Sequence, residues 1–512
     1  MWLQRFQSVS EPARRSAFHS HDLAIPGARG PLACRKEHAL MPRRAGTIRE
    51  APEIRLRATS GGVAATDESE FHAVRVVDGV NVSCPRQRAP TLALADLNAV
   101  LWSRPVSALP RQLLYATSAR IGGSGLDAVA LESLRAVEQA GIDWRALAYD
   151  DQRRAELPRE RIRTLRWHPV RLLSGLGSEL YYGAKKHALD AAAARELVRK
   201  ASAGGSSENG GTLFHGWSGE CVRTLREARR LGVPTIVENA TWHRHKGKAK
   251  PARLTKSERE RAEARGWQAW KNRLLVTRQQ TLEEYDLADL LLVLSEKAEE
   301  TFLAAGVPRE KLFRHQRGVD VERFTPAEKP PGIFRAVFVG ALIQRKGVHH
   351  LLRAWRGLAL KDAELVLVGA VHEEIEPALR EWGGDDVKLP GFVSRVEECY
   401  RAAAVHVFPS SCEGSAKATY EAAACGLPQI ATRESGDVVL DCVNGIIIPP
   451  DDPDAIAAAL ERLYRDRELC ADLGAAGRRR MVEHFTWEHF RVRLLDAYAT
   501  AMARRDSRSE SL

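Results

Sequence analysis

The sequence has few cysteines and few aromatic residues, with 8 Cys and 6% aromatics in 512 residues. The cysteines form no CxxC pair and no regular spacing, so neither a disulfide framework nor a zinc ribbon is indicated, and we expect mostly free thiols in a reducing compartment. No apolar run reaches the roughly 18 residues that a membrane span requires, since LADLLLVLS is too short. These absences leave an ordinary globular protein as the expected class.

Negative charge is also in short supply, because the formal net charge is +11 and the pI is about 9.3. This balance favours an anionic partner, which could be a phosphate-bearing ligand, a membrane surface or a nucleic acid. The sequence contains no nucleic-acid recognition module, so we expect no nucleic-acid partner. A chain of this length predicts two or three domains.

Residues 1–108 differ from the rest of the chain. They are rich in Arg, Ser, Pro and His and have few periodic apolar runs, which predicts a largely irregular extension. A short strand pair near 72–83 is the one local signal. Whether this extension belongs to the mature functional protein is left open.

From residue 109 the pattern alternates between short apolar strands and amphipathic helices. Such alternation predicts parallel sheets covered by helices on both faces, and it restarts after GVDVERFTP at 318–326. The predicted first-lobe strands are 113–117, 146–149, 212–216, 234–240 and 290–295. The first predicted helix of this lobe runs from the glycine-rich turn at 122–125 to about residue 140, and the others cover 186–200, 218–231, 255–288 and 296–305. The predicted second-lobe strands are 334–340, 363–369, 387–391, 404–410, 428–432 and 445–449, with helices near 347–358, 373–382, 394–403, 416–425 and 453–466.

The sequence therefore predicts an α/β protein with two doubly wound, Rossmann-like lobes, residues 109–318 and 319–485, facing each other across a cleft. The closing segment, 486–512, reads as a helix. It has Leu494, Leu495, Tyr498 and Met502 on one face, which predicts that it packs back toward the first lobe. Ligands of such sheets bind beyond the carboxyl ends of the strands.

The stretch SSCEGSAKATYEAAACGLP, residues 410–428, lies at such an edge. It carries Glu413 in the loop after a buried strand and Glu421 about two helical turns further on. The rise of a helix separates the two carboxylates by roughly 10 Å along the axis, which excludes a proton-sharing pair. The unpaired amides of the first turn, near Ser415 to Ala418, could cradle a phosphate group.

EGSAKATYEA followed by ACGLP resembles the E-x7-E signature of family 4 retaining glycosyltransferases, which have the GT-B fold. GVDVERFTP, FVGALIQRKGVHHLL, LPGFVS and SGDVVLDCVNGIIIPPDDPDAIAAAL resemble other segments of that family, in order, from about 318 to 470. The resemblance implies a metal-independent hexosyltransferase that moves a sugar from a nucleotide-diphosphate donor to an acceptor hydroxyl with retention. It implies no cofactor and a role in polysaccharide or glycolipid synthesis. We expect a cytoplasmic location, and the basic stretch 243–271 leaves a peripheral position at the inner face of the membrane open. The acceptor, the sugar and the base are not indicated.

The resemblance also implies residue roles. Glu421 would bind the ribose hydroxyls, Glu413 would stabilise positive charge at the anomeric carbon, and Lys346 would neutralise the leaving diphosphate. Ala341 stands where the family usually has an arginine, and Arg345 is the candidate for the second positive charge. The other implied residues are His243 against the donor sugar, and Gly340, Ser415, Ala416, Lys417, Ala418, Phe392, Val393, Gly122, Gly123 and Ser124 as donor-binding residues.

Several alternatives stay open at this point. Ala341 keeps a non-catalytic, sugar-nucleotide-binding GT-B protein as an alternative, whereas LLYATSARIGGSGLDAV lacks the glycine spacing of a nicotinamide enzyme. The basic stretch 243–271 could bind an anionic membrane surface or an anionic acceptor, or it could be a solvated helix. Lys417 could meet phosphate or point to solvent. Asp452-Pro453-Asp454 reads as a helix start rather than a metal site, and we expect no metal.

Overall fold

The computed structural model describes residues 109–509 apart from 124, 152–156, 166–167, 177, 204–210, 246–264, 267, 269–273 and 330–331. The described residues all belong to one compact unit. The N-terminal extension and the strand pair expected near 72–83 lie outside the described residues.

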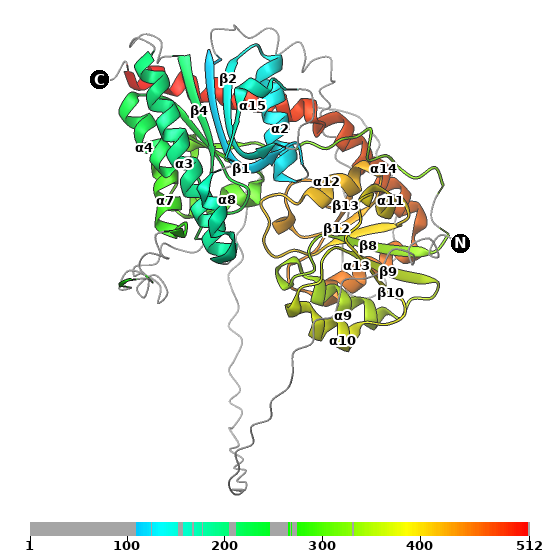
Figure 1. Cartoon of the computed structure of the whole chain (residues 1–512). Helices are drawn as coiled ribbons and strands as arrows, with labels where there is room; N and C mark the ends of the chain where they lie inside the picture. The colour runs from blue at the N-terminus through cyan, green and yellow to red at the C-terminus, as the bar shows by residue number, and fades with distance from the viewer. Residues whose placement is uncertain are drawn as a thin grey trace, which may run out of the picture. The chain divides into compact units, whose positions relative to one another are not determined.

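The first lobe is built on a parallel sheet with the strand order β3-β2-β1-β4-β5-β6-β7 (Figure 1). Its central strands are buried along their whole length, which explains why they read as continuous apolar runs rather than as alternating patterns. The strands are β1 (Gln112–Ile121), β2 (Asp143–Asp151), β3 (Ile162–Thr164), β4 (Thr212–Trp217), β5 (Thr235–Glu238), β6 (Leu290–Val293) and β7 (Leu312–Arg314).

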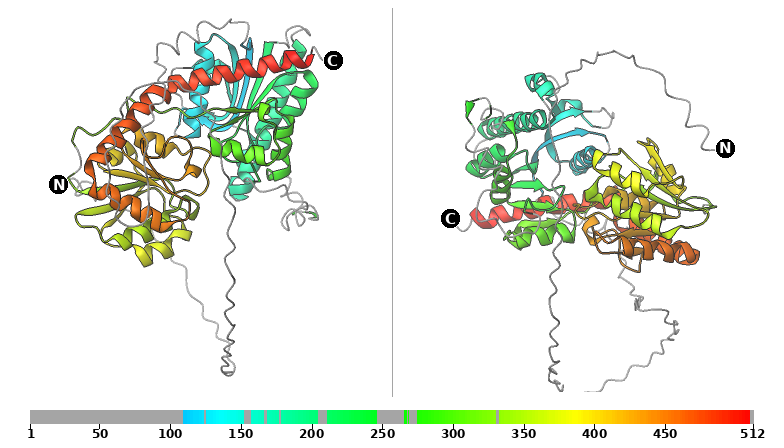
Figure 2. Two further views of the ribbon diagram at one scale, coloured as in Figure 1. Left: turned by 180° about the vertical axis from the view of Figure 1, so that it is seen from behind. Right: turned by 90° about the horizontal axis from the view of Figure 1, so that it is seen from below.

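Helices cover both faces of this sheet. One face packs against α2 and the C-terminal helix α15, and the other packs against α3, α4, α7 and α8. The bounds are α2 (Leu126–Gln139), α3 (Ser178–Ala203), α4 (Val222–Leu231), α7 (Arg278–Leu287), α8 (Glu296–Ala304) and α15 (Trp487–Ser509). Phe490, Leu494 and Tyr498 of α15 are buried in the core of the first lobe, and Figure 2 shows this helix running along the sheet.

The second lobe has a parallel sheet with the strand order β10-β9-β8-β11-β12-β13. Helices α9, α10 and α13 pack in the core on one face, α11 and most of α12 pack in the core on the other, and α14 contributes to both. The strands are β8 (Phe334–Val339), β9 (Ala363–Val368), β10 (Val387–Gly391), β11 (Val405–Phe408), β12 (Gln429–Ala431) and β13 (Gly445–Ile447). The helices are α9 (Val348–Leu358), α10 (Glu376–Trp382), α11 (Val396–Arg401), α12 (Lys417–Ala424), α13 (Pro453–Arg465) and α14 (Arg467–His484).

The prediction of two doubly wound units is confirmed, and the differences are local. The short strands β3 and β7 and the helix α14 were not predicted. The long helix expected over 255–288 is helical at its C-terminal end, but it is interrupted at 275–277, and α7 begins at Arg278 behind a Thr277 capping box. Most of residues 255–273 lie outside the described part.

Asp452 caps α13, as predicted. Its side chain accepts a hydrogen bond of 2.9 Å from the Ala455 amide, and Pro453 occupies the first helical turn. A proline is suited to this position because its missing N–H would have no partner there. The cysteines of the described residues form no disulfide with one another, in line with the prediction.

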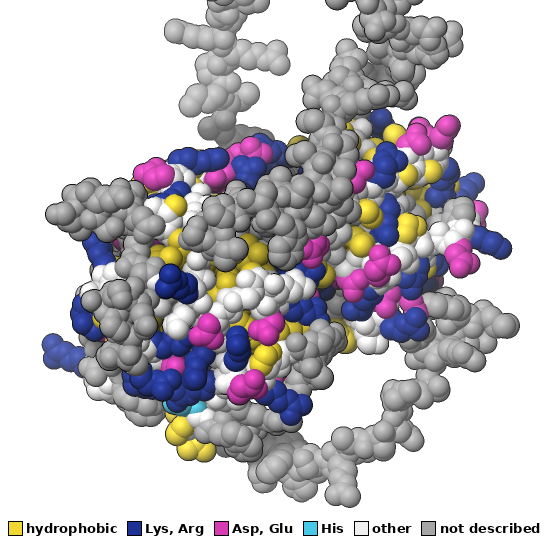
Figure 3. Space-filling model, turned by 90° about the horizontal axis from the view of Figure 1, so that it is seen from above, with side chains coloured by type: hydrophobic (Ala, Val, Ile, Leu, Met, Phe, Trp, Pro, Cys, Tyr) yellow, Lys and Arg dark blue, Asp and Glu magenta, His cyan; other side chains and the backbone are white. Residues whose placement is uncertain are grey.

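Two further observations concern the described residues. Within the described residues, no helix combines the length and the apolar character needed to cross a membrane. On the face drawn in Figure 3, Lys and Arg side chains lie in small groups with Asp and Glu side chains beside them. The described residues of that face therefore form no continuous patch of one charge sign.

Burial makes the fold sensitive to acid through His406 of β11. Burial lowers the pKa of this imidazole to about 4, and its Nδ1 forms a hydrogen bond of 3.0 Å with Gln429 Oε1. Between this value and the ordinary 6.5 the unfolded chain binds a proton that the folded chain does not, so the free energy of unfolding falls as pH falls through that window. The full effect of one such group is about 3 kcal/mol at roughly 1.4 kcal/mol per pH unit.

We expect that His406→Asn loses less stability between pH 6.5 and 4.5 than the wild-type protein. Chemical denaturation at both pH values measures this, with the exposed His372→Asn as the matched control. Equal acid sensitivity of His406→Asn and wild type would contradict the prediction.

Candidate active site

The centre of the candidate site is a cluster of charges where two loops of the second lobe meet. Arg345 and Lys346 lie in the turn between β8 and α9, and Glu413 lies in the loop between β11 and α12. Glu413 Oε1 is 2.9 Å from an Arg345 guanidinium nitrogen and 3.8 Å from Lys346 Nζ. The prediction that these three residues act together therefore has a geometric basis.

The backbone holds these two loops together. The Arg345 carbonyl accepts hydrogen bonds from the Ser411 amide at 2.9 Å and from the Ser410 and Ser411 hydroxyls. The Arg345 guanidinium also donates to the Cys412 carbonyl. Arg345 is thus fixed at both ends, and it is a structural clamp on the Glu413 loop as well as a source of charge.

Lys346 is largely enclosed, and this enclosure is made possible by Gly340. Gly340 has φ 148°, and a Cβ at this position would lie 2.8 Å from Lys346 Nζ. Burial lowers the pKa of Lys346, although the nearby Glu413 carboxylate opposes that shift. A poorly hydrated ammonium beside one carboxylate interacts strongly with an anion that enters the site. Ala341 follows Gly340 and carries no charge.

Glu421 lies inside α12 and is buried, with 4% of its surface exposed. Its Oε2 accepts a hydrogen bond of 3.2 Å from the Tyr400 hydroxyl, and its Oε1 is 2.5 Å from Lys417 Nζ. Lys417 is therefore paired within its own helix while 42% of its side chain stays exposed, and a contact with phosphate stays a prediction. The spacing i,i+4 is the signal that could have predicted this pair.

The N-terminus of α12 supplies part of the expected phosphate cradle. Helix geometry leaves the amides of Lys417 and Ala418 without intrahelical acceptors. The Ala416 amide was predicted to be free for a ligand. It donates instead to the Ser435 carbonyl at 2.8 Å. The Ser415 hydroxyl is hydrogen-bonded to the Tyr420 hydroxyl at 2.8 Å.

Phe392 follows β10 and is 89% exposed, which is unusual for a large aromatic side chain. Val393 is half-buried and packs against the core of the second lobe. The two residues thus differ in role: Val393 anchors the loop, and Phe392 offers a free ring on which a planar base could stack.

In the first lobe, His243 is buried beside His245, Tyr285 and Phe302. Its Nδ1 accepts a hydrogen bond of 3.1 Å from the His245 amide. Burial lowers the pKa of His243 to about 4, so the ring is neutral near pH 7 and carries its proton on Nε2. A neutral imidazole of this kind can donate one hydrogen bond to a sugar oxygen.

The glycine-rich turn lies between β1 and α2. Gly122 and Gly123 are described, Ser124 lies outside the described residues, and the Arg120 amide donates to the Asp127 carboxylate across the turn at 2.9 Å. This places the turn at the carboxyl end of β1. No contact with Glu413 or Lys346 is formed there within the described residues.

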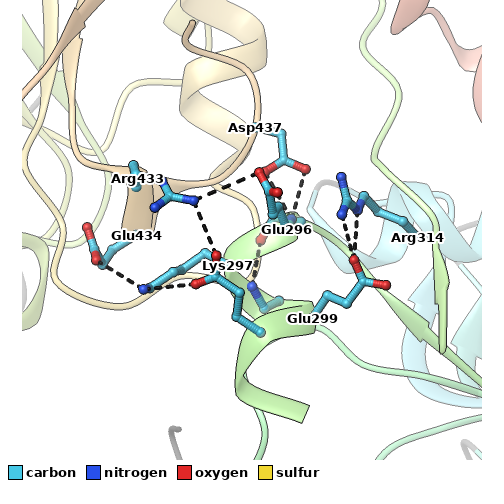
Figure 4. Close-up of polar contacts among 10 residues, drawn as sticks. Glu296, Lys297, Glu299, Arg314, Arg433, Glu434 and Asp437 are labelled. Carbon is cyan, nitrogen blue, oxygen red and sulfur yellow. Dashed lines mark hydrogen bonds and ion pairs between the residues drawn. The ribbon is translucent and has the colours of Figure 1, made fainter. Parts of the chain in front are cut away.

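Side chains near α8 connect the first lobe to the loops of the second lobe (Figure 4). The Ser295 hydroxyl donates to the Gly414 carbonyl at 2.6 Å, and the Glu296 amide donates to both oxygens of Asp437 at 3.0 Å. Gly414 is needed here, because a Cβ would lie 2.3 Å from the Ala240 carbonyl oxygen. The loop that carries Glu413 is therefore held from the first lobe as well.

Asp437, Ser295 and Arg317 are site residues that were not predicted. Arg317 donates from Nε to the Ser415 carbonyl at 3.2 Å, and burial lowers its pKa. Ser295 carries a readable signal, since a serine that precedes a helix is an N-cap, and its hydroxyl does accept from the Ala298 amide. The contacts of Asp437 and Arg317 come from distant segments and have no such signal.

Two other predictions fall partly or wholly outside what can be described. Most of the basic stretch 243–271 is outside the described residues, so binding to a membrane or an anionic acceptor stays a prediction. Among the described residues, no group of three or more His, Cys, Asp or Glu side chains is placed to hold a metal ion.

Residues 334–466 match the family described as glycosyl transferases group 1. This range contains Lys346, Glu413 and Glu421. The chain is 31% identical over 239 residues to a D-inositol 3-phosphate glycosyltransferase of Xylanimonas cellulosilytica, a match that covers 42% of this chain and 57% of that protein. The chain spans about half the length of the curated relatives it matches.

Solved structures resemble most of the chain. A glycosyltransferase from Rickettsia africae has a TM-score of 0.51 and 13% identity over 76% of this chain and 97% of that one. Sucrose-phosphate synthase from Thermosynechococcus elongatus has a TM-score of 0.50 and 19% identity over 78% of this chain and 99% of that one. The predicted GT-B fold is thereby confirmed.

The role of Glu421 can be tested through nucleoside binding. We expect Glu421→Ala to weaken nucleoside diphosphate affinity by about 1–3 kcal/mol, the usual scale for hydrogen bonds to a charged group. Calorimetric titration measures the loss. Glu376→Ala is the matched control, because it removes an exposed carboxylate from the same lobe outside the site, and it should bind like wild type. Unchanged affinity in Glu421→Ala would remove the ribose role.

Proposed function

We propose that this chain is a retaining glycosyltransferase that moves a sugar from a nucleotide-diphosphate donor to an acceptor hydroxyl. The observation that carries the proposal is the contact of Lys346 and Arg345 with Glu413 at the carboxyl edge of the second sheet. The buried Glu421 lies in α12, the helix that follows the Glu413 loop. The match of residues 334–466 to glycosyl transferases supports it.

The geometry suggests how a donor would be held. The Glu421 carboxylate would accept hydrogen bonds from the ribose, and the exposed Phe392 ring would stack on the base. The diphosphate would lie against the first-turn amides of α12 and the ammonium of Lys346, where the helix terminus favours an anion. These contacts place the phosphate charges beside the Lys346 ammonium and the amides of the helix N-terminus, so the proposed binding requires no metal.

Glu413 would lie at the sugar end of the donor. As the bond from the anomeric carbon to the diphosphate lengthens, positive charge grows on the sugar and negative charge grows on the phosphate. A carboxylate near the sugar and an ammonium near the phosphate stabilise both charges in the transition state. The acceptor oxygen would bond to the anomeric carbon on the face from which the diphosphate leaves, and a phosphate oxygen of the departing diphosphate would take the acceptor's proton, so the configuration is retained.

The experiment that tests the proposal is a titration of the protein with a panel of nucleotide sugars, followed by acceptor screening with those that bind. Binding of at least one donor, with sugar transfer or slow hydrolysis, is the expected result. Binding without any release of the sugar would favour the alternative of a non-catalytic sugar-nucleotide-binding protein. No binding of any donor would contradict both.

A further inference from the structure

Arg317 is a charged side chain in an unusual setting. It lies in the segment that leaves β7 for the second lobe, and only 9% of its surface is exposed. Burying a guanidinium is costly unless its charge and its donors are matched by partners. The physical question is which partner balances this charge.

The described protein atoms satisfy only part of the hydrogen-bonding capacity and charge of the Arg317 guanidinium. Within the described residues, the side chain makes one hydrogen bond, from Nε to the Ser415 carbonyl, and no ion pair within 4 Å. Glu238 and Glu413 act on it only from a longer range. An arginine has five donor hydrogens, so its terminal nitrogens keep donor capacity that the described residues do not use.

The position of Arg317 is fixed by the fold. Arg493 of α15 donates to the carbonyls of Gln316 and Arg317, and Val319 pairs with Phe485 through its amide. The segment is thus tied to the C-terminal helices before any ligand binds. Such preorganisation lowers the entropy that binding would otherwise cost.

Ser415 connects Arg317 to the site. Its carbonyl holds the guanidinium, and the first helical amides, those of Lys417 and Ala418, begin two residues later. Glu413 lies two residues before it and acts electrostatically on Arg317. A fork-shaped cation therefore lies beside the residue that leads into the N-terminus of α12, and phosphate oxygens match both the guanidinium and the helix amides.

We infer that Arg317 is a diphosphate-binding residue of the donor site, contributed by the segment between the two lobes. The inference rests on the proposed function and adds a third cation to Lys346 and Arg345, from outside the segment that carries both of them. It offers a source for the positive charge that Ala341 does not supply. Because Arg317 contacts the backbone at the start of α12, its bond to phosphate would also join the inter-lobe segment to the donor.

The test compares a nucleoside diphosphate with the matching nucleoside, which has no phosphate. We expect Arg317→Gln to lower nucleoside diphosphate affinity at least tenfold and to leave nucleoside affinity within twofold of wild type. Arg317→Lys, which keeps the charge but loses the fork, should lie between the two. Arg314→Gln is the matched control, since Arg314 of β7 pairs with Glu299 of α8, and its replacement should change neither affinity.

The outcomes separate cleanly. Equal losses of nucleoside and diphosphate affinity, or no loss of either in Arg317→Gln, would overturn the inference, because a merely structural role does not single out phosphate. If Arg317→Gln fails to fold, Arg317→Lys decides the matter by the same ratio. If the wild-type protein binds nucleoside diphosphates and both Arg317 variants bind them equally well, only the inference on Arg317 is contradicted. Wild-type protein that binds no nucleotide contradicts the proposed function as well.

Discussion

Lys346→Ala should lower the rate of sugar transfer, or of donor hydrolysis, by about 10²- to 10³-fold, the usual effect of removing one group that stabilises transition-state charge. The ammonium is partly buried and lies 3.8 Å from Glu413, so water that enters its place does not stabilise the phosphate charge to the same extent. Donor affinity should fall less than the rate, because the leaving diphosphate carries more charge in the transition state than in the bound donor.

Steady-state kinetics with a donor identified by titration measures this effect. The exposed Lys361→Ala is the matched control, since it removes the same charge from the same lobe outside the site. A rate within threefold of wild type for Lys346→Ala, or an equal loss in Lys361→Ala, would show that the ammonium does not act on the leaving group.

Glu413→Gln should separate binding from catalysis. The amide keeps the shape of the side chain but removes the charge that faces Arg345 and Lys346. The local potential then becomes more positive, so nucleoside diphosphate affinity should be kept or rise. Turnover should fall by about 10- to 100-fold, because a charge-assisted interaction worth about 1.5–3 kcal/mol is lost where positive charge develops on the sugar.

The comparison variant is Glu434→Gln. Glu434 is a neighbouring acid whose carbonyl accepts from the Glu413 amide and whose carboxylate faces Lys297, so it is near the site but not in it. It should keep its turnover. Parallel losses of affinity and turnover in Glu413→Gln would indicate that Glu413 only holds the loop in place.

The parts of the fold that could be predicted are those with a strong local pattern. The buried central strands read as apolar runs because parallel strands are covered on both faces. β3 and β7 were not predicted because they are three residues long, lie at the edges of the sheet, and carry polar or charged side chains. α14 has weak periodicity and two glycines, and Gly474 is there because a Cβ would lie 2.0 Å from the Gly426 carbonyl oxygen.

The site could be predicted where the motif is contiguous. Glu413 and Glu421 are part of one loop and helix, and their spacing alone excludes a proton-sharing pair. The partners that restrict them are distant in sequence: Arg345 is 68 residues from Glu413, and Ser295 is 119 residues from Gly414. No local pattern encodes such pairings. The same reason hides Arg317, which is 98 residues from the carbonyl that it binds.

Donor hydrolysis measured side by side for wild type and Lys346→Ala tests the central claim most directly. Each protein is incubated with the same panel of nucleotide-diphosphate sugars, and the released nucleoside diphosphate is quantified over time. The account predicts release from at least one donor by the wild-type protein and its near-complete loss in the variant. Release from no donor, or equal release by both proteins, would contradict it.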